Sequence, residues 1–110
     1  MIIDFNKMDY ATYENFKGGE KALKAKMYFD GTHRVLCGIL EPGASIGMHT
    51  HDTSSETIFV VGGHGTVIYD GTSTDIAAGQ CHYCPKGHSH SLVNTGDEDL
   101  VFHAVVPELV

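Results

Sequence analysis

Metal-ligating side chains gather in one short stretch of this sequence. His49, His51 and Glu56 place two imidazoles and one carboxylate within eight residues. Side chains on a β-strand alternate between its two faces, so His49 and His51 are expected to point the same way. Two neutral imidazoles side by side make a good pair of metal ligands. Glu56 follows a short polar segment that could fold back to add an oxygen ligand, and His90 could supply a fourth ligand.

For an isolated His-x-His, the alternative interpretation is a solvated strand with an ordinary surface carboxylate nearby. The glycines and the proline around the candidate ligands argue against it here. A first block, residues 43–63, begins and ends with glycine and contains three of the candidates. A second block, residues 79–94, contains Pro85, Gly87 and His90. In order and spacing, these two blocks resemble the two signature motifs of the cupin family, over about half of the chain.

This resemblance has direct implications for the site. It implies that His49, His51, Glu56 and His90 are the ligands of a divalent transition metal. Three imidazoles and one carboxylate suit iron, manganese, nickel, zinc or copper. Because four ligands cannot fill an octahedron, one or two positions would stay open for water or substrate, as in catalytic rather than structural metal sites.

The resemblance also has implications for the fold. It implies an all-β protein, a small antiparallel jelly-roll β-barrel with the site inside, and residues 1–110 are expected to form one domain. Small cupins commonly pair as homodimers through sheet edges. An unpaired edge strand needs some cover, so a homodimer is also expected here.

Alternating apolar residues independently predict strands along most of the chain. From Leu23 to Phe29, every second residue is apolar on one face, which is typical of a half-buried strand. Asp-Gly pairs at 30–31 and 70–71 predict hairpin turns, because glycine accepts the positive φ of a type I′ turn. About nine short strands and no long amphipathic helix are expected, at the spacing of a sandwich or barrel. The other strands are expected near residues 35–39, at the His-x-His of 49–51, and near residues 57–61, 66–69, 74–77, 80–84, 89–93 and 100–106.

Residues 1–20 read as an N-terminal arm. Residues 9–16 could be a short helical turn with Tyr13 and Phe16 on one side, or an irregular segment that covers a sheet edge. The pair Gly18-Gly19 ends this segment. No chemistry is assigned to the arm.

Charge and hydropathy exclude several classes of partner. Seven basic and fourteen acidic residues give a formal net charge of −7. Nucleic acids and anionic membranes both require a basic patch, so neither is an expected partner. The sequence lacks both an apolar stretch long enough for a membrane helix and a secretion signal at its N-terminus. We therefore expect a cytoplasmic location. The small barrel that the resemblance implies could hold one ligand in its mouth, so a small-molecule substrate is also expected.

The three cysteines are an odd number, which argues against a disulfide framework. Cys81 and Cys84 form a Cys-x-x-Cys, which could be a redox or zinc pair. An offset of three residues places them on opposite faces of an extended strand. The favoured interpretation is therefore two small strand residues.

Other histidines raise further hypotheses. His88 would face the site and act as an acid–base group if the strand of His90 begins early enough. If the chain is still turning at Gly87, His88 lies on the rim, and both alternatives stay open. The alternation around His103 does not decide which face it occupies. His33 and His82 are expected on the surface, and His64 is expected in an exposed turn.

Two hypotheses concern residues that could assist a ligand. Arg34, the single arginine, could clamp a carboxylate or phosphate, although a surface ion pair is the commoner role. Ser54 and Ser55 could orient the metal ligands, although an ordinary loop role is favoured.

The function expected is a metal-dependent enzyme for a small polar molecule, of the dioxygenase, isomerase, lyase or decarboxylase type. The alternatives are a non-catalytic module that binds a sugar or organic acid, and a purely structural metal site. Nucleophilic catalysis is not indicated, because no Gly-x-Ser-x-Gly is present and the sequence shows no oriented base for the cysteines.

Overall fold

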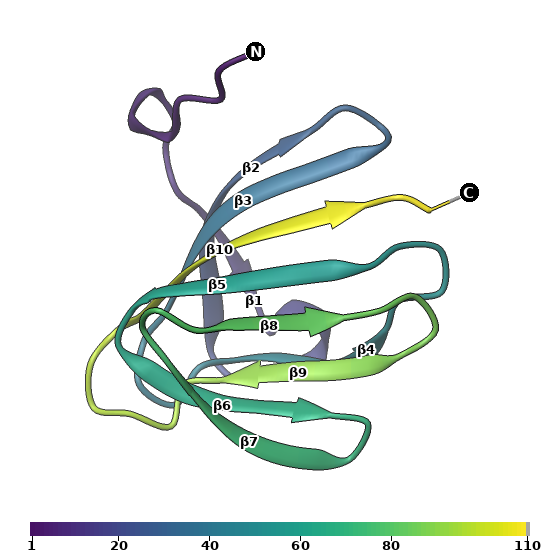
Figure 1. Cartoon of the computed structure of the whole chain (residues 1–110). Coiled ribbons are helices and arrows are strands. Elements are labelled where there is room, and N and C mark those ends of the chain that lie inside the picture. The colour runs from purple at the N-terminus through teal and green to yellow at the C-terminus, as the bar shows by residue number, and fades with distance from the viewer. Residues whose placement is uncertain (110) are drawn as a thin grey trace.

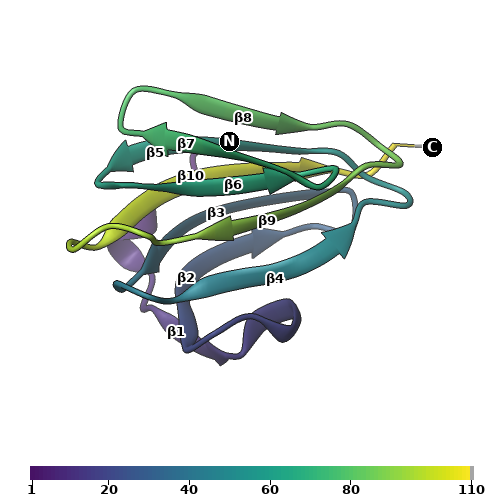
Figure 2. The same cartoon turned by 90° about the horizontal axis from the view of Figure 1, so that it is seen from below.

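A computed structural model describes residues 1–109 as ten β-strands and two short 3₁₀ turns. The strands form two facing antiparallel sheets (Figures 1 and 2). The six-stranded sheet has the order β1-β2-β3-β10-β5-β8, and the four-stranded sheet has the order β4-β9-β6-β7. The expected jelly-roll architecture is confirmed, as two sheets rather than a closed barrel. The elements are η1 (Phe5–Lys7), β1 (Ala11–Glu14), η2 (Phe16–Gly18), β2 (Ala22–Phe29), β3 (His33–Leu40), β4 (Ser45–Thr50), β5 (Glu56–Gly62), β6 (His64–Tyr69), β7 (Thr72–Ala77), β8 (Cys81–Cys84), β9 (Ser89–Val93) and β10 (Leu100–Pro107).

Helical structure in the part of the chain that the structure describes is limited to the two 3₁₀ turns. Across residues 1–109, the chain forms no helix with the length and apolar character needed to span a membrane.

The N-terminal arm covers a sheet edge, as one of the two alternatives expected, but does so as a regular strand and not as an irregular segment. Residues 11–14 form β1, which pairs with β2 at the edge of the six-stranded sheet, and η2 follows. The backbone of η2 then lies directly against β4. A Cβ on Gly47 would overlap the carbonyl oxygen of Lys17, and a Cβ on Gly19 would overlap that of Ser45. Glycine permits this close approach, so the arm is held against β4.

The hydrophobic core lies between the sheets. Leu23, Leu40, Ile58 and Phe102 are almost fully buried there, and burying each such side chain stabilises the fold by about 1.5–3 kcal/mol. Gly38 on β3 pairs with Phe102 on β10. A Cβ at Gly38 would overlap the Phe102 ring, so this glycine makes room for the largest core side chain.

The two Asp-Gly turns have different backbones. Asp70 and Gly71 have φ values of 47° and 82°, as the predicted type I′ turn requires. In the other turn Gly31 has a positive φ, of 97°, but Asp30 does not. The Asp30 carboxylate instead accepts hydrogen bonds from the Thr32 and His33 amides, at 2.9 and 2.8 Å.

The three cysteines are free thiols. Cys81 is exposed and Cys84 is buried, which confirms that the Cys-x-x-Cys pair is divided between the two faces of β8. Cys37 is buried in β3.

Candidate metal centre

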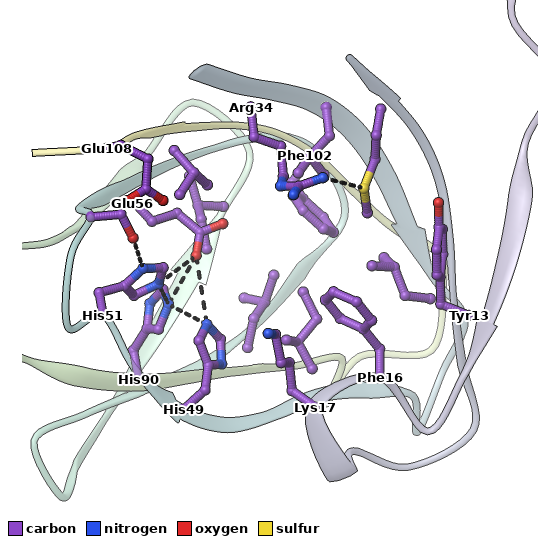
Figure 3. Close-up of a pocket in the computed structure, with 18 residues that line it drawn as sticks. Tyr13, Phe16, Lys17, Arg34, His49, His51, Glu56, His90, Phe102 and Glu108 are labelled. Atoms are coloured by element: carbon purple, nitrogen blue, oxygen red, sulfur yellow. Dashed lines mark hydrogen bonds and ion pairs between the residues drawn. The ribbon is translucent and has the colours of Figure 1, made fainter. Parts of the chain in front are cut away.

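Four candidate ligands converge on one side of a cavity between the sheets (Figure 3). His49 and His90 lie on β4 and β9 of the four-stranded sheet, and His51 directly follows β4. Glu56 begins β5 of the six-stranded sheet. The Nε2 atom of His90 lies 3.1 Å from that of His49 and 2.9 Å from that of His51. Glu56 Oε1 lies 2.9 Å from His90 Nε2 and 3.1 Å from His51 Nε2.

The local backbone explains how the histidines meet. The register of β4 against β9 shifts between Ile46 and His49, after which His49 lies opposite His90. Such bulges commonly re-aim side chains next to functional sites. Beyond the strand, the amide of His51 donates to the carbonyl of His88 at 3.0 Å, and its carbonyl accepts from the amide of Gly87 at 2.6 Å. Main-chain pairing therefore continues past β4 and holds His51 beside His90.

Hydrogen bonds behind the rings orient His49 and His51. The Nδ1 atom of His49 lies 2.8 Å from the carbonyl oxygen of Gly47. A carbonyl can only accept, so Nδ1 carries a proton, and in the neutral ring Nε2 then has a lone pair free for a metal ion. The Nδ1 atom of His51 lies 2.8 Å from Ser54 Oγ. Ser54 therefore supports a candidate ligand, and its expected role as an ordinary loop residue is wrong.

Ser55 has no such contact with a candidate ligand. Its side chain is buried, and its amide donates to the carbonyl of Pro107 at 3.3 Å.

The ring of His90 is supported by His82, a residue that the sequence placed on the surface. The Nε2 atom of His82 lies 3.0 Å from Nδ1 of His90. His82 is half-buried, and this burial, followed by the neighbouring His90, lowers its pKa. The sequence could have predicted that His82 faces inward, because alternation along β8 places it on the same face as the buried Cys84.

The separation of the four donor atoms fits a divalent transition metal. Ligands 90° apart around an ion at about 2.1 Å lie about 3.0 Å from each other, whereas a tetrahedron separates them by about 3.4 Å. Two nitrogen–nitrogen and two nitrogen–oxygen distances of 2.9–3.1 Å match the first arrangement. A fifth distance, 3.9 Å from Glu56 Oε1 to His49 Nε2, approaches the roughly 4.2 Å of opposite octahedral positions. Bare ring nitrogens this close repel each other unless a proton or cation lies between them.

Glu56 supplies negative charge to this cluster. Burial desolvates the carboxyl and raises its pKa, but the neighbouring rings of His49, His51 and His90 outweigh burial and hold the pKa well below its usual range. The buried carboxyl is therefore ionised, and a buried charge of this kind requires a compensating partner. The four residues together are chemically suited to hold a metal ion.

The cavity beside the donors has a volume of about 400 Å³. Leu36, Ile46 and Phe102 line it from the two sheets. The N-terminal arm, to which the sequence assigned no chemistry, contributes Phe16 and Lys17, among others. Little in the sequence indicated that the arm would line the cavity, because the position of the arm depends on its pairing with β2 and on its contacts with β4.

Arg34 also lines the cavity. Its Nη1 atom lies 3.6 Å from the sulfur of Met27, and its guanidinium carbon lies 4.3 Å from the centre of the Phe29 ring. The surface ion pair expected for Arg34 is absent among residues 1–109. The half-buried guanidinium therefore has only weak partners there.

His88 lies on the rim, one of the two positions that the sequence left open. It precedes β9, its Nδ1 atom lies 2.5 Å from Asp70 Oδ2, and it does not line the cavity. The hydrogen bond from His88 lowers the pKa of Asp70. The acid–base role of His88 remains a prediction, with no contact to the cavity that supports it.

The other histidines lie away from the cavity. His103 is exposed on the outer face of the six-stranded sheet, where its ring centre lies 6.0 Å from that of Phe5. His33 and His64 are exposed, as predicted.

With this geometry established, comparison with known proteins identifies the family. A family model described as "Cupin domain" matches residues 38–106. The chain belongs to the cupin family. The match includes both motifs from which the resemblance was first drawn, and all four candidate ligands of this cupin lie within it.

A named protein and a crystal structure, both from Thermotoga maritima, are similar to this cupin. A protein named "Oxalate-binding protein" is 39% identical over 112 residues, which cover 96% of this chain and 93% of the relative. A crystal structure described as "a predicted oxalate decarboxylase" has a TM-score of 0.92 at 28% identity, covering 99% of this chain and all of that one. KdgF from Halomonas sp. has a TM-score of 0.79 at 18% identity, covering 98% and 94%, and this likeness supports the fold alone.

Proposed function

We propose that this cupin is a metal-dependent enzyme that acts on a small carboxylate. The observation that carries the proposal is that one cavity holds both the four converging donors and Arg34. A guanidinium binds a carboxylate through two parallel hydrogen bonds, and Arg34 has no carboxylate partner among residues 1–109. The relative named for oxalate binding supports the same class of ligand.

His49, His51, Glu56 and His90 would hold the ion, which we propose to be iron, manganese, nickel, zinc or copper. When bound, the ion supplies Lewis acidity at the coordination positions that the four residues leave open. The protein fixes the ligand rings from behind, through contacts such as that of Ser54 with His51. The apolar wall of the cavity limits water near the bound carboxylate.

Glu108 is the carboxyl group of the cavity that lies outside the donor cluster. It is exposed, and its Oε2 atom accepts a hydrogen bond from the Thr53 hydroxyl at 2.7 Å. Among the reaction types expected, decarboxylation would use the metal site, Arg34 and Glu108 together. The bond from carbon to the carboxylate breaks, carbon dioxide leaves, and the electron pair that remains takes up a proton from water, which we propose that Glu108 relays.

A second candidate function is binding without catalysis. It is favoured by the name of the 39% identical relative, which refers to binding and not to a reaction. It is also favoured by the position of His88, which lies outside the cavity and offers no second proton-transfer group.

Calorimetry and product assays on one set of samples test the proposal. Protein prepared without metal and protein loaded anaerobically with manganese, iron or zinc are titrated with oxalate. We expect binding to require the metal, and Arg34→Gln to weaken it about 10- to 100-fold through loss of a charged hydrogen bond. Lys24→Gln removes an exposed positive charge from β2 and is the matched control. Equal binding with and without metal, or full affinity in Arg34→Gln, would contradict the proposal.

The product assays then separate the two candidates. Release of carbon dioxide without oxygen uptake supports the decarboxylase, whereas oxygen uptake supports a dioxygenase. Metal-dependent binding without turnover, for every metal and for a panel of small carboxylates, supports the binding module.

A further inference from the structure

We infer that the ligand of this cavity carries an apolar body on its metal-binding carboxylate, and is therefore larger than oxalate. The inference rests on the proposed function only for the binding of the ligand's carboxylate to the metal. The cavity volume of about 400 Å³ equals that of about thirteen liquid water molecules at about 30 Å³ each. Oxalate is only two joined carboxylates, so it would fill a fraction of this space and leave the remainder to water.

The chemistry of the wall disfavours water in that remaining space. Beyond the donors, the two sheets line the cavity with hydrocarbon side chains, among them Leu36, Ile46, Leu92, Phe102 and Val106. Water against such a wall loses hydrogen bonds, and a hydrocarbon group that displaces it gains affinity. Burial of one methylene group is expected to improve affinity about fourfold.

The arrangement of the cavity gives this ligand a direction (Figure 3). The donor cluster lies at one side, the aromatic side chains of Tyr13 and Phe16 lie at the other, and Arg34 and Lys17 face each other across the space between. A carboxylate bound near the donors would have a cation on either side. The rest of the molecule would then extend toward Tyr13 and Phe16, whose ring centres lie 5.6 Å apart in an edge-to-face contact.

The aromatic end belongs to a fixed part of the fold. Tyr13 lies on β1 and is paired with Leu23 of β2. Lys17 follows Phe16 with a φ of 56°, an unusual conformation for a residue other than glycine. The contact of its carbonyl with Gly47 secures this backbone. The aromatic pair is therefore in place before a ligand binds, and it is suited to select ligands by the length of their apolar body.

Calorimetry with a homologous series tests the inference. Pyruvate, 2-oxobutanoate, 2-oxopentanoate and 2-oxohexanoate share one chelating head and differ by single methylene groups. Zinc-loaded protein is used because zinc has no redox chemistry. We expect Kd to fall about fourfold per methylene, or about 60-fold across the series.

Two variants from opposite walls locate the effect. Phe16→Ala should weaken 2-oxohexanoate binding by at least tenfold and leave pyruvate binding unchanged, with exposed Tyr83→Ala as the matched aromatic control. Because Phe16→Ala removes packing from the arm, Val106→Phe on β10 provides an independent test at the other end of the cavity, since Val106 is paired with Arg34 beside the proposed carboxylate position. It should weaken pyruvate and 2-oxohexanoate alike, and circular dichroism verifies the fold of each variant.

The outcomes separate this inference from the proposed function. Equal affinity across the series, with oxalate bound by the zinc-loaded protein, overturns the inference and leaves the proposed function intact. Stronger binding of longer acids that is the same with and without zinc supports the apolar cavity and overturns the proposed function. If Val106→Phe weakens 2-oxohexanoate and spares pyruvate, the inferred direction of the ligand is wrong.

Discussion

The Nε2 atom of His82 lies 3.0 Å from Nδ1 of His90, on the side of the His90 ring that faces away from the donor cluster. When His90 Nε2 serves as a ligand, Nδ1 carries the proton and donates a hydrogen bond to Nε2 of His82. Such contacts behind a ligand typically change metal affinity 10- to 100-fold. We therefore expect His82→Phe, which keeps a ring but not the acceptor, to weaken zinc binding by this factor. Competition with a chelating dye measures it, with exposed His33→Phe as the control; unchanged affinity would mean that His82 only fills space.

Removal of a candidate ligand should have a larger effect on metal content. His51→Ala or His90→Ala is expected to release most of the bound metal and to leave the fold largely intact, because the core lies elsewhere between the sheets. Elemental analysis after gel filtration measures the metal, and circular dichroism the fold. His64→Ala, at an exposed position, should retain the wild-type content. Full metal content in either ligand variant would count against the assignment.

The close backbone contact at Gly47 leads to a prediction on stability. A methyl group there would overlap the carbonyl oxygen of Lys17, so Gly47→Ala should destabilise the protein by about 1–3 kcal/mol. Gly62→Ala is the matched control, because a Cβ at Gly62 would make only ordinary contacts with Val101. Urea unfolding of both variants measures the difference. If the two variants unfold alike, the arm is not held tightly at this point.

Asp30 predicts part of the response to acid. Hydrogen bonds from the amides of His33 and Thr32 lower the pKa of Asp30 from 3.8 to about 2. The carboxylate therefore contributes stability above about pH 4, and this contribution is lost as the pH falls toward 2. Between these pH values, wild-type protein should lose more stability than Asp30→Asn. Unfolding curves at several pH values test this, with Asp97→Asn as a charge-matched control that should follow the wild type.

Thiol reactivity should distinguish the two cysteines of β8. Burial raises the pKa of Cys84 to about 11, so only about one molecule in a thousand carries the thiolate at pH 8. Cys81 is exposed. Brief treatment with iodoacetamide should therefore modify Cys81 and spare Cys84, as peptide mass spectrometry can show. Rapid modification of both residues in folded protein would contradict the arrangement of this strand.

Much of this architecture could be predicted from sequence, because its signals are local. Period-two alternation predicts the strand β2 (Ala22–Phe29), and the spacing of glycines and histidines identifies all four residues that converge in the cavity. The support behind these residues was harder to predict. The contacts of Ser54 and His82 depend on which face of a strand or loop turns inward, and this is decided by tertiary packing.

The arm shows the same limit more strongly. Tyr13 and Phe16 are close in sequence, and their spacing permits a helical turn. Pairing of residues 11–14 with β2 overrides that local preference and places both rings in the cavity wall. The orientation of Arg34 likewise depends on the shape of the space between the sheets.

The origin of the four candidate ligands in different sheets has a mechanical consequence. Glu56 begins a strand of one layer, whereas His49 and His90 belong to the other. An ion shared among them would cross-link the two sheets and would oppose their independent opening fluctuations. Loss of the metal would then make the scaffold more flexible, besides removing the chemistry that the ion supplies. The rates of amide hydrogen exchange in the two sheets would become less similar.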